Sequence, residues 1–502
     1  MLKPESIKRG VSYSIALSLL ARALGFVLQF CITYYFGAKG STDAFFWCMT
    51  LVISFSALIT SIDSAVVIPH GIHLLNAEGK EPMRLFLVTV MKGYLGVSLA
   101  ATLLLVCFPG TMAGWLSRFD AQIIGENLRI IRLTWLVLPV LTASALLSDT
   151  FGIYKMFSVT IAIEALKSLM SLLVFLALRP WLGGEAMAWG FLAGCILQLL
   201  LLIAVMKNRM GWLFGLAGGI VPRAVRANIG ITLLGQLSAF LFSLSISYLL
   251  SGFATGIYSS MNYGSSLVNL IQLVFTAKIS YVVGIFFMDL YSQKKTGELN
   301  FLFLRYLRPA LLALLFAIPL LIHFSDDLVS LAFERGSFGH DDVLVTSRFF
   351  RLLLLSLPFI LIDGFVTQLI FAAKKVGSGF YLQLGYNFAN ILVIWFLVGR
   401  MGYVGYPIGL LIVRILYLLA LWIYIRSTFA FLDFGAVMRF LLKNGATLAL
   451  SVAVIWPLRE SHLPVFGWLL PLALSASIAV WSENRATLVQ AMAMVKARLA
   501  HG

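Results

Sequence analysis

The segment RIIRLTWLVLP, residues 129–139, recurs in outline as RFFRLLLLSLP, residues 348–358. Two arginines, a proline and a lysine recur with the same spacing, each 219 positions later in the chain. The first set is Arg129, Arg132, Pro139 and Lys155, and the second set is Arg348, Arg351, Pro358 and Lys374. All eight lie in or beside long apolar segments, and the neighbouring segments also align. A membrane chain that repeats itself in halves is the usual build of a secondary transporter, with the substrate path between the halves.

The composition places the chain in the membrane. Of its 502 residues 61% are hydrophobic and only 12% are charged, with a mean hydropathy of +0.96, whereas a soluble protein carries about 25% charged residues. A membrane-spanning helix needs about 20 apolar residues. Fourteen stretches are long enough: 11–36, 44–70, 84–108, 129–152, 156–178, 186–206, 228–251, 258–288, 306–324, 346–373, 379–399, 404–425, 437–457 and 463–482. We therefore predict an all-α polytopic membrane protein of about 14 transmembrane helices.

The repeat organises these spans. It covers 11–206 and 228–425, six spans each. Because six is even, both copies share one orientation and are related by an axis along the membrane normal. The predicted parts are an N-terminal six-helix lobe (1–210), a cytoplasmic linker (211–227), a C-terminal six-helix lobe (228–426), two extra transmembrane helices (427–483) and a cytoplasmic tail (484–502). The first hairpins of the two copies also align after one gap, Thr42-Asp43 with Thr255-Gly256.

The net charge of +16 is interpreted as a sign of how the chain is oriented in the membrane. It does not indicate a nucleic-acid partner. With the N-terminus in the cytoplasm, most Lys and Arg outside the spans fall on the cytoplasmic side, which fits the positive-inside rule with both termini cytoplasmic. The first apolar run is too long for a signal peptide and is interpreted as the first span. The four cysteines fall in apolar segments, so a disulfide framework is not expected.

Charges inside the spans point to function, because each costs roughly 2.5–3.5 kcal/mol at mid-bilayer. Arg22 and Lys278 lie in spans from different halves, and two cations in a central cavity would suit a phosphate or diphosphate group. The alternative is that they pair with Asp63 and Asp363 for folding alone. The span that contains Lys278 is also rich in amides, which suit a polar cavity wall: Asn262, Asn269 and Gln272.

Arg132 and Arg351 lie about one turn inside the interface on the outer side, and pairing or snorkelling is favoured over substrate contact. Pro139 and Pro358 would kink the middle of their spans. The chain contains no HExxH, P-loop or Cys/His metal spacing. We therefore expect a transporter without a metal or other cofactor, and not an enzyme.

Two stretches resemble the MurJ/MviN family, bacterial lipid II flippases of the multidrug/oligosaccharidyl-lipid/polysaccharide exporter superfamily. The first is Arg22-Ala23-Leu24-Gly25-Phe26, followed by Phe36-Gly37-Ala38 and Thr42-Asp43-Ala44-Phe45-Phe46. The second is Phe333-Glu334-Arg335-Gly336-Ser337-Phe338, which is similar to the family's FERGxF segment. The span count, the repeat and the two extra spans agree with the family.

The resemblance implies alternating-access transport of an undecaprenyl-diphosphate-linked saccharide from the inner to the outer leaflet of the bacterial cytoplasmic membrane. It implies a lipid-linked saccharide and membrane lipids as partners; a coupling ion is left open. Arg22 and Asp43 match family residues important for transport. Three other cavity positions depart from the family's charged pattern: Val27-Leu28-Gln29, Ser54 to Leu58 and Tyr263-Gly264-Ser265. Lys278 is our own candidate to replace part of that charge.

Four alternatives stay open at this point. The first is a flippase for an O-antigen or exopolysaccharide oligosaccharide in place of lipid II. The second is a cation-coupled drug exporter of the same superfamily, which would want a carboxylate-centred cavity and which Asp63 and Asp363 keep open. The others are a membrane glycosyltransferase, which usually needs a large catalytic loop, and a scaffold that has lost transport.

Overall fold

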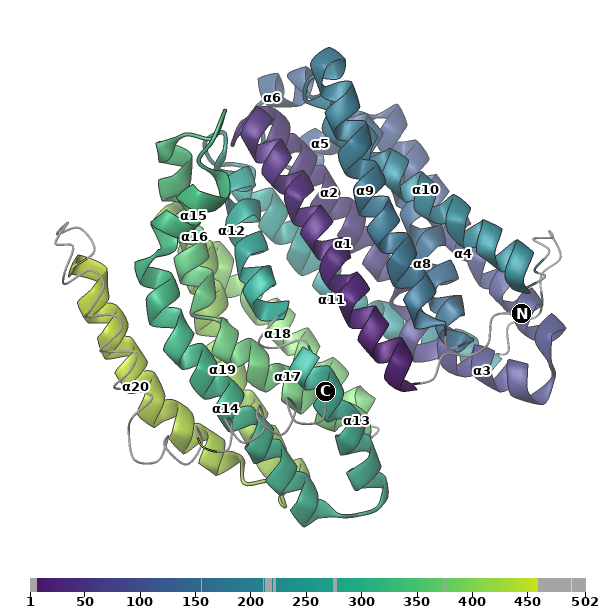
Figure 1. The fold of residues 1–502 in the computed structure, drawn as a ribbon, viewed down its shortest axis with the longest axis vertical. Helices are drawn as coiled ribbons and strands as arrows, with labels where there is room; N and C mark the ends of the chain where they lie inside the picture. Colours follow the sequence, from purple (N-terminus) through teal and green to yellow (C-terminus); the bar gives the residue numbers. More distant parts are fainter. Residues whose placement is uncertain are drawn as a thin grey trace. The chain divides into compact units, whose positions relative to one another are not determined.

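The computed structural model describes residues 7–154, 156–210, 212, 219, 223–273, 278–373, 375–458 and 489. Every regular element in these ranges is a helix (Figure 1). The chain divides into two compact units. The N-terminal unit comprises residues 1–259 with 335–339, and the C-terminal unit comprises residues 260–334 with 340–502.

The N-terminal unit holds long apolar helices joined by short turns. Its elements are α1 (Ile7–Phe36), α2 (Gly40–Thr60), the π-helical turn η1 (Asp63–Val67), α3 (Ile68–Ala77), α4 (Lys80–Cys107), α5 (Pro109–Leu116), α6 (Ala121–Glu126), α7 (Leu128–Trp135), α8 (Val137–Ile153), α9 (Phe157–Leu182), α10 (Glu185–Met210) and α11 (Arg223–Leu250). The first turn of α12 (Ile257–Gln272) also belongs to it.

The C-terminal unit contains the rest of α12 and is likewise built from helices joined by short turns. Its elements are α13 (Lys278–Ser292), α14 (Thr296–His323), α15 (Ser325–Phe333), α16 (His340–Leu354), α17 (Leu357–Ala372), α18 (Val376–Met401), the 3-10 turn η3 (Gly402–Val404), α19 (Gly405–Thr428) and α20 (Phe434–Leu458). The four cysteines all lie in the N-terminal unit and carry free thiols.

The polytopic all-α prediction is confirmed, while the count of fourteen stays a prediction. Within the described ranges nine helices are long and apolar enough to cross a membrane, or up to ten if a bent pair counts as one span. One of the nine, Gly377–Thr428, contains both α18 and α19, which correspond to two predicted spans. The predicted span 463–482 and the predicted tail 484–502 lie outside the described residues, apart from residue 489.

The repeated prolines mark a helix break in each copy. Helix α7 ends at Trp135 just before Pro139, and α16 ends at Leu354 just before Pro358. Proline has no N–H to give to the carbonyl four residues earlier. In the first copy that carbonyl, of Trp135, accepts the hydroxyl of Thr102 on α4 at 3.4 Å. In the second copy α16 and α17 meet at a bend of 44°, which confirms the kink expected at Pro358.

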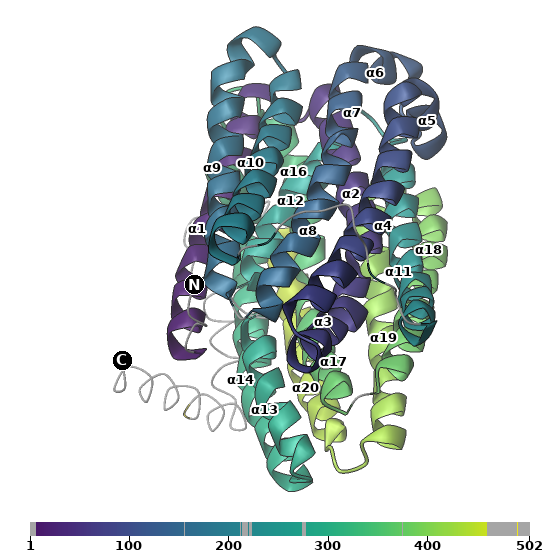
Figure 2. The same cartoon turned by 90° about the vertical axis from the view of Figure 1, so that its right-hand side faces the viewer.

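Helices α9 and α10 lie side by side (Figures 1 and 2) because glycines let their backbones approach. A Cβ built on Gly190 would come within 2.7 Å of the Ser171 carbonyl oxygen, and one on Gly194 within 2.7 Å of the Lys167 carbonyl oxygen. Small residues four apart are the usual means of close helix contact in a membrane, where no hydrophobic force drives association. Helix α1 packs on the other side of α9, with Tyr35 and Phe36 against Phe175.

We expect Gly194→Ala to destabilise the protein by about 1–3 kcal/mol, because a methyl group forced against backbone atoms overpacks the interface. The matched control is Gly96→Ala on α4, where an added Cβ meets nothing within 4 Å. That variant should stay within about 1 kcal/mol of the parent, since alanine favours a helix over glycine by that amount. The measurement is thermal unfolding in detergent, and equal effects of the two changes would contradict the packing argument.

Candidate functional site

The carboxylate of Asp43 lies at the N-terminus of α12. Asp43 itself is in the first turn of α2 and is only 2% exposed. Its Oδ2 accepts the N–H of Gly256 at 2.6 Å, and its Oδ1 accepts the N–H of Ser259 at 2.7 Å as well as the Ser259 hydroxyl. These N–H groups have no partner inside their own helix, and a helix N-terminus favours negative charge. Asp43 therefore caps α12 from a distant part of the sequence.

A second contact joins α1 to the segment 335–339. The N–H of Ser337 donates to the carbonyl of Tyr34 at 2.8 Å, and the Ser337 hydroxyl donates to that of Tyr35 at 2.9 Å. Both carbonyls belong to the last turn of α1, where the carbonyl groups have no N–H donor within the helix. The segment 335–339 therefore caps the C-terminal end of α1.

Three glycines make this arrangement sterically possible. Gly37 and Gly336 both have a φ of +63°, and a Cβ on either would collide with the backbone carbonyl of the opposite segment, at Ser337 and Tyr34 respectively. Gly256, with a φ of +94°, would bring a Cβ within 2.6 Å of the Ala38 carbonyl oxygen. Only glycine adopts such φ values at no steric cost. We call residues 34–43, 255–259 and 335–339 together the hairpin clasp.

Arg22 is exposed on α1, in the middle of an apolar helix. Within the described ranges it has no ion-pair or hydrogen-bonding partner. Lys278 is the first residue of α13, and its side chain lies outside the described part of the chain. On α12, Asn262 and Gln272 are half-buried and Asn269 is exposed. Their spacing of seven and then three residues puts the three amides on one helix face.

The two arginines that correspond in the repeat differ in their surroundings. Arg132 on α7 is exposed. Arg351 on α16 is 6% exposed, forms an ion pair with Asp326 and donates to the Ser347 hydroxyl at 2.9 Å. A buried guanidinium of this kind is held by charge and hydrogen bonding together, so Arg351 is occupied within its own unit.

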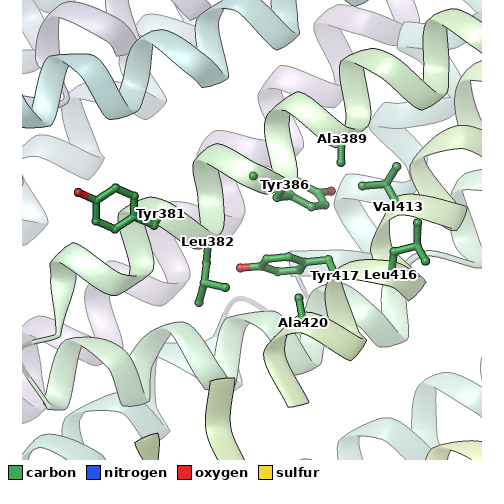
Figure 3. Close-up of a pocket in the computed structure, with 9 residues that line it drawn as sticks. Tyr381, Leu382, Tyr386, Ala389, Val413, Leu416, Tyr417 and Ala420 are labelled. Atoms are coloured by element: carbon green, nitrogen blue, oxygen red, sulfur yellow. The ribbon is translucent and has the colours of Figure 1, made fainter. Parts of the chain in front are cut away.

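Asp363 on α17 belongs to a cluster that includes residues of α18 and α19. Its side chain is hydrogen-bonded to Thr367 and Tyr417, and Arg414 is its favourable electrostatic partner. The Arg414 guanidinium lies 5.7 Å from the ring centroid of Tyr386. Tyr386 and Tyr417, whose ring centroids are 4.8 Å apart, line a cavity of about 230 Å³ between α18 and α19 (Figure 3). The sequence singles out Asp363 as a charge inside a span, but it carries no signal for the tyrosines.

Asp63 has partners of a different kind. It accepts a hydrogen bond from the hydroxyl of Tyr94 and lies against Asp149. The charged candidates whose side chains are described thus fall into three groups: carboxylates held by their own unit, a paired Arg351, and the exposed Arg22 and Arg132.

Replacing Asp43 by alanine should lower the free energy of unfolding by about 3 kcal/mol or more, because each buried donor left unsatisfied costs about 1–3 kcal/mol. Asp43→Asn keeps an acceptor oxygen and should lose less. Asp120→Asn, at an exposed position, is the control and should change stability by no more than about 0.5 kcal/mol. Hydrogen exchange at residues 256–259 provides a local readout. Unchanged protection in Asp43→Ala would contradict the capping role.

A double-mutant cycle tests the Asp363 cluster. Asp363→Asn and Arg414→Gln should each destabilise by up to about 3–5 kcal/mol, because each leaves a charge without its partner inside the protein. The double variant should cost clearly less than the sum of the two. Additive effects in urea unfolding would show that the two side chains do not depend on each other.

Comparison with known proteins agrees with this arrangement. The family model described as lipid II flippase MurJ matches residues 32–474. The chain is 23% identical over 376 residues to a probable lipid II flippase MurJ of Buchnera aphidicola subsp. Baizongia pistaciae (strain Bp), covering 71% of each chain. It is also 23% identical over 383 residues to a probable lipid II flippase MurJ of Aquifex aeolicus (strain VF5), covering 74% of each.

Solved structures show the same fold. A lipid II flippase MurJ in an inward closed conformation superposes with a TM-score of 0.75 at 17% identity, covering 95% of this chain and 100% of that one. An inward-facing multidrug resistance MATE family transporter of the MOP superfamily gives a TM-score of 0.65 at 12% identity, covering 82% and 94%. The family model covers most of the chain, and the chain therefore belongs to the MurJ family of lipid II flippases, which are multi-pass bacterial inner-membrane transporters and not enzymes.

Proposed function

We propose that this protein moves lipid II, or a closely related undecaprenyl-diphosphate-linked saccharide, from the inner to the outer leaflet by alternating access. Both termini are cytoplasmic in this proposal, and the lobes 1–210 and 228–426 move about the bound headgroup. The linker 211–227 connects the lobes, while the helices of 427–483 stay beside the lipid tail and the tail 484–502 lies at the cytoplasmic face.

The observation that carries the proposal is the state of Arg22. A cation within an apolar helix costs roughly 2.5–3.5 kcal/mol, and Arg351 and Arg414 offset that cost through acidic partners in their own unit. Arg22 is exposed instead. A guanidinium held open in this way suits the oxygens of a diphosphate, which it binds through two parallel hydrogen bonds.

Other predicted contacts complete the proposed headgroup site. Lys278 adds a second cation, and the polar face of α12 supplies amides from Asn262, Asn269 and Gln272 for the sugar hydroxyls. These groups replace the charged pattern that the resemblance leads one to expect in the cavity. The assignment of all of them to substrate binding is part of the proposal.

The hairpin clasp supports the alternating-access part of the proposal. Asp43 ties the first hairpin of one repeat to the first hairpin of the other through hydrogen bonds to Gly256 and Ser259. A few hydrogen bonds and close glycine contacts can separate without unfolding either helix pair. We assign the hairpin clasp as the gate on the outer side. In this proposal the hydrogen bonds from Gly256 and Ser259 to Asp43 break when the headgroup is released.

The drug-exporter alternative has weaker support. The MATE structures resemble this chain in fold at 12–15% identity, whereas the MurJ family model matches the sequence itself over 32–474. An O-antigen or exopolysaccharide substrate is not favoured by any of the relatives. Lipid II is therefore the substrate to test first.

Complementation of bacteria depleted of their own lipid II flippase tests the proposal. The parent chain should restore growth, and Arg22→Ala should abolish rescue at an unchanged level of membrane-inserted protein. Losing a charge-assisted hydrogen bond of about 1.5–3 kcal/mol corresponds to about a tenfold or larger loss of headgroup binding. Arg132→Ala removes another exposed arginine and is the matched control, which should retain rescue.

Two results would contradict the proposal. Normal rescue by Arg22→Ala would remove Arg22 from the headgroup site. Failure of the parent chain, shown to be folded and inserted, would exclude lipid II as substrate. The parent would then be tested with other undecaprenyl-diphosphate-linked glycans in reconstituted vesicles.

A further inference from the structure

Asp63 lies where the helix that begins as α2 changes its winding. It is the first residue of the π-helical turn η1, which leads into α3. Its side chain is 1% exposed, and its neighbours in the core include Ile62, Val66 and Phe151. Short π-helical turns inside helices are frequently found at functional sites. A carboxyl group at such a turn in an apolar core needs a specific compensating partner.

The two oxygens of Asp63 meet different neighbours. Oδ1 accepts the hydroxyl of Tyr94 from α4. Oδ2 is buried and meets no N–H or O–H donor among the described residues. The group beside Asp63 is the carboxyl of Asp149 on α8, which is half-buried.

Two adjoining carboxyl groups in an apolar setting do not both ionise, because their like charges repel each other. An ionised carboxylate can only accept a hydrogen bond, whereas a protonated carboxyl group can donate one. A single proton on the pair would therefore let Asp149 donate to Oδ2 of Asp63, which has no other donor among the described residues. Tyr94 satisfies the remaining oxygen, so the pair carries one negative charge at most.

The other charged and titratable groups on the surrounding helices do not compensate the pair. On α3, His70 and His73 stack on each other at 6.3 Å, and His70 also meets Phe86. From α11, the residues packed on this core are the apolar Ile229 and Leu233.

The charged side chains of α4, α7, α9 and α10 have other surroundings. Lys167 lies over the ring of Phe191 at 5.7 Å and beside Cys195. Arg129 and Glu185 pair at 3.4 Å.

On α4, Arg84 pairs with Glu81 at 2.8 Å, and on α9 Arg179 lies over the ring of Tyr35 at 3.4 Å. The other charged residues of α4, α7, α9 and α10 whose side chains are described are exposed: Lys80, Lys92, Arg132, Glu164 and Lys207.

We propose that Asp63 and Asp149, with Tyr94 as hydrogen-bond donor, form a binding site for one proton that the protein takes up and releases during its transport cycle. The role in transport rests on the proposed flippase function, while the proton site itself does not. A hard metal ion is a weaker candidate because it takes six or more oxygen ligands. No three metal-ligating side chains gather at one place in the described part of the chain.

Tyr94, the hydrogen-bond donor to Asp63, also lines an apolar cavity. This cavity has a volume of about 650 Å³ between α2, α4 and α11, with Ile59, Ile62 and Leu233 among its residues. A movement of these helices that reshapes the cavity would therefore also reach the hydrogen bond between Tyr94 and Asp63.

Infrared difference spectroscopy of the full chain in phosphatidylethanolamine–phosphatidylglycerol vesicles tests the site. The parent should show a protonated-carboxyl C=O band at neutral pH that shifts in D₂O. Asp63→Asn and Asp149→Asn should each remove it, because an amide N–H replaces the shared proton and keeps the pair hydrogen-bonded. Asp120→Asn, at an exposed position, should retain the band.

Each other spectroscopic outcome overturns the site. No band in the parent would mean that both groups are ionised. A band that survives in both Asn variants would belong to another carboxyl group. Loss of the band on adding Na⁺ at constant pH would assign the pair to sodium.

The role in transport is measured separately, by lipid II flipping in the same vesicles under an imposed pH gradient. One proton per cycle should shift the equilibrium leaflet ratio by about tenfold per pH unit, and Asp149→Asn should abolish that dependence. A parent that flips lipid II without regard to the gradient would overturn the coupling. A parent that flips nothing would contradict the flippase function, and the infrared result would still decide the proton site.

Discussion

The carboxylate of Asp43 against the first turn of α12 is the constraint on which the N-terminal unit depends. It lets α12 begin beside α2 by satisfying the N–H groups that a helix leaves open at its start. The repeat shows that the two partners of this contact occupy corresponding positions in the two copies. Asp43 of one copy bonds to Gly256, its own counterpart in the other copy, so the two hairpins can meet only because they differ. Two aspartates there would repel each other, and two glycines would leave the donors unsatisfied.

Three carboxyl groups of the described helices are stabilised in three different ways; Asp43 and Asp63 are buried and Asp363 is half-buried. Asp43 uses backbone N–H groups, Asp363 uses an arginine and tyrosines, and Asp63 uses a proton shared with Asp149. Each solution has a different consequence for motion. Backbone hydrogen bonds break when helices separate, an ion pair resists separation, and a shared proton lets the charge of the site change. A transporter needs the first and third types at places that change and the second at places that stay fixed.

The sequence predicts the membrane class and the helix breaks well, because hydropathy and the missing N–H of proline act locally. The resemblance to the MurJ/MviN family also singles out Asp43, and the sequence flags Asp63 and Asp363 as charges that need a reason. It could not identify their partners. Tyr94 and Asp149 are brought to Asp63 by the packing of α4 and α8 around η1, and Tyr417 is brought to Asp363 by the packing of α19 against α17. Tyrosines in apolar helices carry no distinguishing pattern, so only the packed structure reveals them.

The cap on α1 has a consequence for biosynthesis. The carbonyl of Tyr35 receives its hydrogen bond from Ser337, a residue 302 positions later. At about 5–20 residues per second, the ribosome delivers that residue about 15–60 s after α1 has been made. During this interval the carbonyl groups at the end of α1 lack their hydrogen-bond partner, because the segment 335–339 has not yet been synthesised. The first half of the protein therefore enters the membrane as an unfinished unit, and the closing segment of the second half completes it.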